Sequence, residues 1–191
     1  MDKRSPCNDH WAYSVAVYSR PGVALSCLAL QDSVHLDVNV LLVALWATGL
    51  IGRAVLPDEI AAADREISVW RKEVVQPLRN IRRGLKKGSF LACDQGTDGL
   101  RNLVKTSELN AERVEQKVLA TWAKSLPPGS EEQEESMWVR TAERVIVFYA
   151  SQGADSELGN DLIISGRVIA LAAAAEAAGF AGFLDKPRRR P

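Results

Sequence analysis

The sequence predicts an all-α protein of about seven helices packed around one central apolar helix, Val38–Gly52. Apolar residues recur at steps of three and four along nearly the whole chain, whereas no segment alternates in the manner of a strand. The segment Val38–Gly52 is apolar on every side, which is typical of a helix buried by its neighbours. With 191 residues, the chain is long enough for a single domain, residues 1–191, with a substantial core.

Composition and charge narrow the class of protein further. The hydrophobic fraction of 47% and the charged fraction of 25% are those of an ordinary soluble globular protein. The 24 basic and 24 acidic residues cancel, so no global field attracts the chain to nucleic acid or anionic membrane. Three cysteines are too few for a disulfide framework and indicate free thiols. The N-terminus lacks a secretory signal and the longest apolar run, Val40–Ile51, is too short to span a bilayer, so we expect a cytoplasmic protein.

The N-terminal part of the chain predicts two helices and a polar connection. The first helix covers Asn8–Ser19, with an apolar stripe formed by Trp11, Val15 and Tyr18. Pro21 and Gly22 end it, and the second helix then carries a wide apolar face that includes Leu25 and Leu28. A turn at Ser33–Leu36 leads to Asp37, whose carboxylate is suited to cap the central helix.

The fourth predicted helix is the longest and starts at Pro57. Its apolar residues recur at helical spacing and predict a continuous core-facing seam of Ile60, Ala63, Ile67, Trp70, Val74, Leu78, Ile81 and Leu85. Pro77 lies inside this pattern and lacks a backbone N–H, so we expect a kink or a break near Val74.

Three further helices are expected in the second half of the chain. They cover Ser107–Lys124, Glu131–Ser151 and Glu157–Ala178. A capping-box sequence at Ser130–Gln133 favours the start of the second of these, and Gly179 is expected to end the third. The glycine-bearing loop at 88–106 is a possible sub-boundary within the domain, and residues 186–191 form a basic tail.

A set of motifs in the first half follows one order and spacing. They are Trp11-Ala12-Tyr13-Ser14, Pro21-Gly22-Val23, Cys27-Leu28-x-Leu30-Gln31-Asp32, Asp37-Val38-Asn39-x-Leu41-Leu42, Trp46 and Trp70-Arg71-x-x-Val74-Val75-x-Pro77-Leu78-Arg79. Over about residues 11–87 the chain resembles a small family of uncharacterised proteobacterial proteins that share a domain of unknown function. The resemblance implies a bacterial protein and brings no established activity or catalytic residues.

The strongest charged feature is a basic strip toward the end of the fourth helix. Seven basic residues are opposed by Glu73 alone, a local charge of +6; they are Arg71, Lys72, Arg79, Arg82, Arg83, Lys86 and Lys87. At helical spacing, the four from Arg79 to Lys86 are expected to share one exposed side opposite Leu78, Ile81 and Leu85. Arginine favours bidentate contacts to oxyanions, which predicts a surface for an acidic protein or nucleic-acid phosphates. A solvated face that complements the helix dipole is the alternative.

Polar residues also gather between the second and third helices: Gln31, Asp32, His35, Asp37 and Asn39. One interpretation is a structural clasp, in which Asp37 caps the central helix while Gln31 and Asn39 satisfy backbone groups. The other is a small site, with Asp32 and Asp37 as paired carboxylates for acid–base chemistry or a hard metal ion, and Asp32 as the base.

Neither a metal nor a cofactor is predicted. The polar turn matches no known metal loop, and Cys7 and His10 supply two of the three or four protein ligands that zinc needs.

These patterns lead to two functional hypotheses. The first is a non-enzymatic binding module that uses the basic strip, Arg71–Lys87, for an anionic partner. The second is a small-molecule or metal-dependent enzyme with a polar site at Gln31, Asp32, Asp37 and Asn39. A peripheral membrane protein held by the basic residues is a third class, but it lacks an amphipathic anchor rich in exposed apolar residues. The oligomeric state is left open.

Overall fold

The computed structural model describes residues 9–87, 97–129, 136–152 and 160–184. These residues form helices and no strand, which confirms the all-α prediction. Seven continuous helices result when α4, the π-helical segment η2 and α5 are taken as one. The elements are α1 (His10–Tyr18), α2 (Val23–Val34), α3 (Val38–Ile51), α4 (Pro57–Trp70), η2 (Arg71–Val75), α5 (Gln76–Lys87), α6 (Thr97–Ser125), α7 (Ser136–Ala150) and α8 (Asn160–Leu184).

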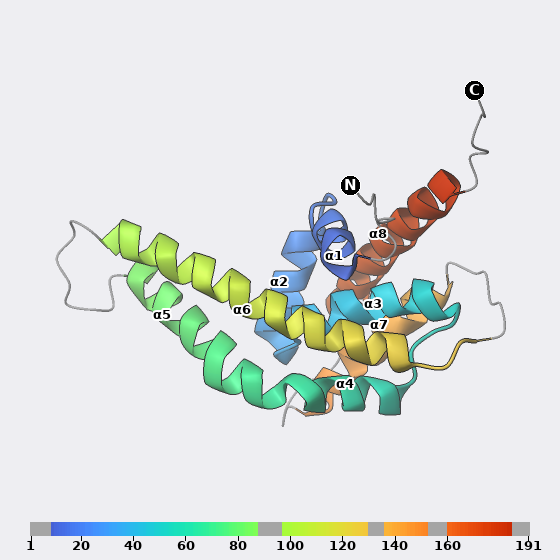
Figure 1. Ribbon diagram of the computed structural model, residues 1–191, viewed down its shortest axis with the longest axis horizontal. Coiled ribbons are helices and arrows are strands. Elements are labelled where there is room, and N and C mark those ends of the chain that lie inside the picture. Colours follow the sequence, from blue (N-terminus) through green and yellow to red (C-terminus); the bar gives the residue numbers. More distant parts are fainter. Residues whose placement is uncertain (1–8, 88–96, 130–135, 153–159, 185–191) are drawn as a thin grey trace.

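Helix α3 lies at the centre of the molecule, as predicted. Eleven of its 14 residues are buried, and α1, α4, α6, α7 and α8 all contact it (Figure 1). Leu45 is fully buried and Trp46 nearly so. The predicted cap is confirmed, because Oδ1 of Asp37 accepts hydrogen bonds from the backbone N–H groups of Asn39, at 2.8 Å, and Val40, at 3.3 Å.

Helix α8 packs against α7, α2 and α1 on one side of α3. At Gly166 the two helices approach closely: an added Cβ would collide with Cδ1 of Ile146, so the end of the Ile146 side chain would have to move. On the side of α8 that faces α1, the Tyr13 hydroxyl donates to the Ala173 carbonyl at 2.9 Å. The helix continues to Leu184, so the prediction that Gly179 ends it was wrong. A glycine inside a helix costs only about 1 kcal/mol relative to alanine, which is too little to stop a helix of 25 residues.

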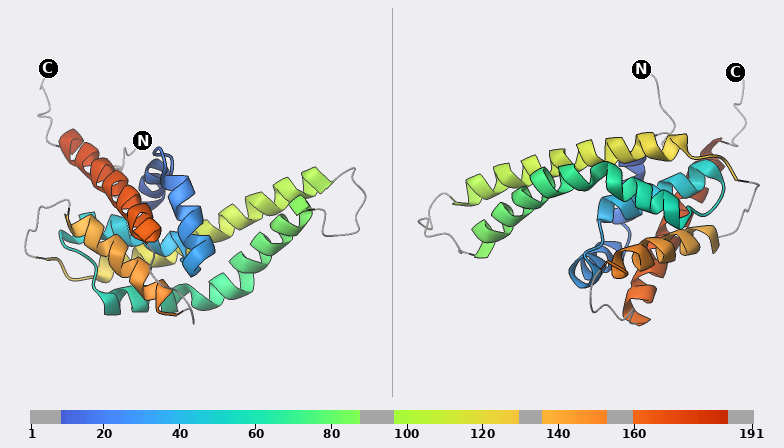
Figure 2. Two further views of the ribbon diagram at one scale, coloured as in Figure 1. Left: turned by 180° about the vertical axis from the view of Figure 1, so that it is seen from behind. Right: turned by 90° about the horizontal axis from the view of Figure 1, so that it is seen from below.

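Helices α5 and α6 form an antiparallel arm that projects from this body (Figures 1 and 2). Helix α6 begins at Thr97 rather than near Ser107, so residues 97–106 of the predicted loop are helical. The rest of that loop, 88–96, lies outside the described residues, as do the predicted capping box at Ser130–Gln133 and the basic tail at 186–191.

A π-helical turn, in place of a break, joins α4 to α5. The N–H of Gln76 donates to the carbonyl of Arg71, five residues earlier, and Pro77 follows immediately. The wider turn accommodates one additional residue and shifts the inward-facing positions of the helix by one. Val75 is therefore buried, while Ile81 is 43% exposed. The predicted core seam consequently ends at Ile67 instead of continuing to Leu85.

No helix in the described ranges combines the length and the apolar character that crossing a membrane requires.

The apolar face predicted for α2 is divided between two environments. Cys27 and Leu30 are buried, whereas Leu25 and Leu28 are 75% and 45% exposed.

Candidate functional site

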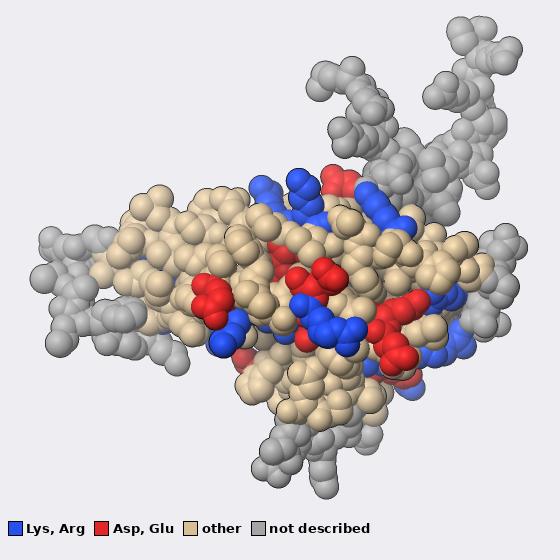
Figure 3. Space-filling view, turned by 60° about the horizontal axis from the view of Figure 1, so that its bottom comes forward, with Lys and Arg blue, Asp and Glu red and all other residues tan. Residues whose placement is uncertain are grey.

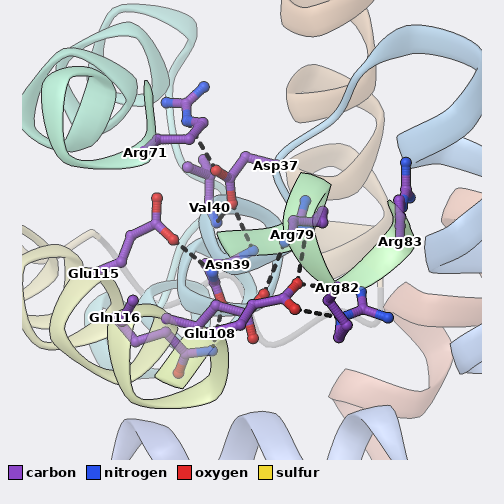
Figure 4. A network of polar contacts seen from close by, with 12 residues as sticks. Asp37, Asn39, Val40, Arg71, Arg79, Arg82, Arg83, Glu108, Glu115 and Gln116 are labelled. Carbon is purple, nitrogen blue, oxygen red and sulfur yellow. Dashed lines mark hydrogen bonds and ion pairs between the residues drawn. The ribbon is translucent and has the colours of Figure 1, made fainter. Parts of the chain in front are cut away.

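Two arginines of the basic strip, Arg79 and Arg82, turn toward α6 instead of solvent (Figure 4). Nε of Arg79 lies 3.1 Å from Oε1 of Glu108, and its Nη2 lies 2.7 Å from Oε1 of Glu112. Arg82 donates to both oxygens of Glu108. The prediction that these arginines share one exposed side with Arg83 and Lys86 was therefore wrong, because the π-turn changes the phase of the helix before it reaches them.

The carboxylates that receive these arginines are unusual in their burial. Burial disfavours the charge of Glu108, but hydrogen bonds from Arg82 and Arg79 outweigh it and leave the pKa of Glu108 below its ordinary value. At Glu112 burial dominates over the attraction of Arg79, and the pKa of Glu112 is raised. These ion pairs link α5 to α6 along the arm.

Arg71, the first residue of the basic strip, is also occupied inside the protein. Its Nε lies 2.9 Å from Oδ2 of Asp37, and its Nη2 lies 2.6 Å from Oδ1 of Asp64. The same Asp64 oxygen accepts a hydrogen bond from the hydroxyl of Tyr149 at 2.5 Å. Arg71 therefore ties η2 to the start of α3, to α4 and to α7.

The remaining described side chains of the strip are exposed. Lys72 is 79% exposed and lies 3.8 Å from Glu73, and Lys86 is exposed as well. Arg83 is 45% exposed and lies 3.7 Å from Oδ1 of Asp32. The side chain of Lys87 lies outside the described residues. On the face drawn in Figure 3, the basic and acidic side chains of the described residues are interleaved.

The polar turn is divided between structural and surface roles. Asp37 uses one oxygen for the cap of α3 and the other for Arg71. Asp32 is 68% exposed and contacts Arg83. His35 ends α2 in the left-handed conformation, with φ of 54°. The Asp37 part of the clasp interpretation is thus present in the structure, and Asp32 and Asp37 have separate partners.

Asn39 does not satisfy backbone groups, as the clasp interpretation expected, but joins a buried network on α6. Its Nδ2 donates to Oε2 of Glu115 at 2.7 Å, and its Oδ1 accepts from Nε2 of Gln116 at 2.9 Å. Sequence reasoning missed Glu115 and Gln116 because they lie 76 and 77 residues from Asn39. A usable signal was present, since Glu108, Glu112 and Glu115 follow helical spacing on the side of α6 that also carries Ala111.

Glu115 is fully buried, and its carboxyl group responds to that environment. Burial, reinforced by the nearby charge of Asp37, raises the pKa of Glu115 to about 8, although the hydrogen bond from Asn39 opposes the shift. Glu115 accepts from the nitrogen of the Asn39 amide, and Asn39 presents its oxygen to Gln116. Gln116 then uses its nitrogen for Asn39, and its Oε1 is buried without a partner.

A pocket of about 440 Å³ lies where α1, α2, α3, α5 and α6 meet. It brings Gln31 and Asn39 of the polar turn together with Arg79, Arg82 and Arg83 of the basic strip; Asp32 and Asp37 do not line it. Its lining comprises Trp11, Ser14, Val15, Tyr18, Ser19, Cys27, Leu28, Gln31, Val38, Asn39, Leu42, Arg79, Arg82, Arg83, Lys105, Glu108, Leu109, Glu112 and Gln116. The predicted stripe on α1 thus faces this pocket, and Lys105 is a lining cation that sequence reasoning missed.

The pocket combines cationic, apolar and thiol groups. Arg79, Arg82, Arg83 and Lys105 against Glu108 and Glu112 leave two positive charges in its lining. The Cys27 thiol is buried, which raises its pKa to about 12 and makes it a poor nucleophile. Within the described residues, no group of three or more His, Cys, Asp or Glu side chains is arranged to hold a metal ion.

The comparisons with known proteins agree with the resemblance found in the sequence. The model of a family described as "Protein of unknown function (DUF2390)" matches residues 9–119, and the chain belongs to this family. The match includes every residue that lines the pocket and ends before α7. No curated protein and no solved structure matches the chain.

Proposed function

We propose that this member of the DUF2390 family is a non-enzymatic binding module that receives an anionic group of its partner at the pocket between α1, α2, α5 and α6. The observation that carries the proposal is the charge of the lining, in which four cations stand against two carboxylates. We also propose that it works in a bacterial cytoplasm, as its sequence suggests.

Two of the lining cations, Arg83 and Lys105, are exposed and can form an ion pair with an anionic ligand. Arg83 is 45% exposed, and its contact with the 68% exposed Asp32 is 3.7 Å long. Such an exposed pair contributes about 0–1 kcal/mol, so a carboxylate or phosphate that enters the pocket competes with it easily. Lys105 is exposed on the α6 side of the same pocket. Arg79 and Arg82 are held in ion pairs by Glu108 and Glu112, so the net positive charge of the lining comes from Arg83 and Lys105.

The arrangement of Asp32 and Asp37 favours a binding function over catalysis. Both carboxylate oxygens of Asp37 have partners, in the cap of α3 and in the ion pair with Arg71. Asp32 lies on the surface and outside the pocket lining. A general base must reach the proton that it abstracts, and neither carboxylate is placed to act on a molecule inside the pocket.

Retention on immobilised heparin, used as a polyanionic probe, tests this proposal. The double variant Arg83→Gln/Lys105→Gln removes two pocket cations, and Lys72→Gln/Lys117→Gln removes two exposed cations from outside it. The two variants have equal net charge, so they differ only in where the cations are lost. We expect the pocket variant to elute at clearly lower salt than the wild-type protein, and the control variant to elute close to the wild type, because the pocket cations make the contact. Equal shifts of both variants would contradict the proposal, since retention would then depend on total charge alone.

A further inference from the structure

The pocket carries more information about its ligand than charge alone. Its volume of about 440 Å³ lies within the range of roughly 300–1,000 Å³ that small-molecule sites occupy. Much of its wall is apolar and comes from Trp11, Val15, Tyr18, Leu28, Leu42 and Leu109. Val15, Leu28 and Leu109 remain 47%, 45% and 42% exposed. A ligand with an apolar body would remove this surface from water and gain the corresponding hydrophobic free energy.

Two unpartnered polar atoms belong to buried side chains of the same lining. Ser14 is 2% exposed and its Oγ has no partner; Gln116 is 3% exposed and its Oε1 has none. Both oxygens are closed off from solvent, so a donor reaches either one only when neighbouring lining side chains move. Because a buried polar atom without a partner costs about 1–3 kcal/mol, a ligand that forms this contact gains stability from it.

The network behind Gln116 determines what it binds. Glu115 accepts from Asn39, and Asn39 accepts from Gln116, so the amide of Gln116 offers an oxygen and not a nitrogen (Figure 4). An amide oxygen is an acceptor only, which requires an N–H or O–H donor on the ligand. Ser14 is compatible with the same donor, because a hydroxyl accepts as well as donates.

We propose that the pocket binds a small organic acid whose carboxylate lies at Arg83 and Lys105, whose apolar body lies against the α1 and α2 side chains, and whose N–H or O–H group donates to Gln116. This inference rests on the proposed function and adds the chemical class of the ligand. The cations select the acid, and the orphan acceptor selects, among acids of similar size, those with a donor.

Three related probes separate these features in calorimetric titrations of the full chain. Indole-3-propionate has the carboxylate, the apolar body and an N–H; 3-(2-naphthyl)propionate lacks the N–H; 3-(indol-3-yl)propan-1-ol lacks the carboxylate. We expect indole-3-propionate to bind most tightly and to lose roughly three- to tenfold in affinity when the N–H is absent. The alcohol should bind more weakly than indole-3-propionate, and Arg83→Gln/Lys105→Gln should remove that difference while Lys72→Gln/Lys117→Gln retains it.

Two substitutions test the donor contact. Gln116→Met removes the acceptor and should equalise the affinities of the indole and naphthyl acids. Since Gln116→Met also deprives Asn39 of a hydrogen bond, Ser14→Ala provides a milder variant, which should reduce the preference for the indole acid without changing the fold. If Gln116→Met does not fold, the comparison of the two acids on the wild-type protein decides the matter.

Equal affinities of the wild-type protein for the indole and naphthyl acids would overturn the inference, because water would then satisfy Gln116. Failure of all three probes to bind would overturn it as well. In either case heparin retention that depends on Arg83 and Lys105 would leave the proposed function standing. Loss of that dependence would instead remove the proposed function together with the inference.

Discussion

Helix α3 and the α5–α6 arm are stabilised by different forces. In α3, 11 of 14 residues are buried and most are apolar, so the hydrophobic effect fixes its position. In the arm, Leu100 and Leu103 are 51% and 68% exposed, while Glu108 is 5% exposed. The arm thus has polar side chains inside and several apolar side chains outside.

This difference shows how one π-helical turn changes which residues of a long helix face inward. Up to Ile67 the long helix follows the same rule as α3, with apolar residues inward. From the end of η2 the inward positions are Val75, Arg79 and Arg82, and arginine–glutamate pairs replace apolar contacts. Because these cations are used within the protein, the binding capacity proposed above concentrates at the pocket and not along the whole strip.

The largest expected effect on the free energy of unfolding is at the central helix α3. Leu45→Ala removes a fully buried side chain from α3 and should lower the free energy of unfolding by about 2–5 kcal/mol. Leu103→Ala, at a position 68% exposed on the arm, should change it by about 0.5 kcal/mol or less. Chemical denaturation of both variants measures the contrast. Similar losses in the two would show that burial does not distinguish these regions.

A second prediction concerns the pH dependence contributed by Glu115. Its pKa rises from 4.5 to about 8 on folding, so the folded state holds the proton more tightly than the unfolded state between these values. This contribution to stability is fully present below the unfolded pKa and is lost as the pH rises through the folded pKa. Between about pH 5.5 and about pH 9, the wild type should lose roughly 1–3 kcal/mol relative to Glu115→Gln.

The Glu115→Gln variant retains an oxygen for the Asn39 amide, so the comparison isolates the proton. His10, whose pKa is lowered chiefly by burial, contributes a pH dependence of opposite sign, but it does so in both proteins. Urea denaturation at several pH values gives the two stability curves. Parallel curves would mean that Glu115 is ionised throughout this range.

Smaller effects on stability are expected at two helix caps. Asp9 and Asp37 both cap helices, but Asp37 also binds Arg71. Substitution of either by alanine should cost about 0.5–2 kcal/mol, with Asp37 at the upper end. Asp9→Ser should recover nearly all of that loss, whereas Asp37→Ser should recover only the cap and leave Arg71 without one partner. Thermal unfolding measures all four variants, and complete recovery by Asp37→Ser would argue against a stabilising role of the ion pair.

The sequence predicted those parts of the fold that depend on neighbours along the chain. The burial of Leu45, the cap at Asp37 and the start of α4 at Pro57 follow from local patterns, and the structure confirms each. The orientation of Arg79 could not be predicted in the same way, because it depends on the phase change at η2 and on Glu108, 29 residues away.

The candidate site was predictable only in pieces, for the same reason. Gln31, Asn39 and Arg83 were singled out as members of two separate clusters, and only the packing of α1, α2, α5 and α6 unites them in one pocket. Gln116 and Lys105 stand in a helix with no motif around them. Their partners come from other helices, so one-dimensional spacing carries little information about them.

The most direct test of the internal role of the arginines is a double-mutant cycle on Arg82 and Glu108. The free energy of unfolding is measured for Arg82→Gln, Glu108→Gln, the double variant and the wild type, with Arg79 retained in all four. We predict a coupling energy of about 1 kcal/mol or more, against less than about 0.5 kcal/mol for the exposed pair Lys72 and Glu73. Strict additivity of the Arg82 and Glu108 substitutions would contradict the account, since Arg82 would then behave as a solvated cation on an exposed helix face.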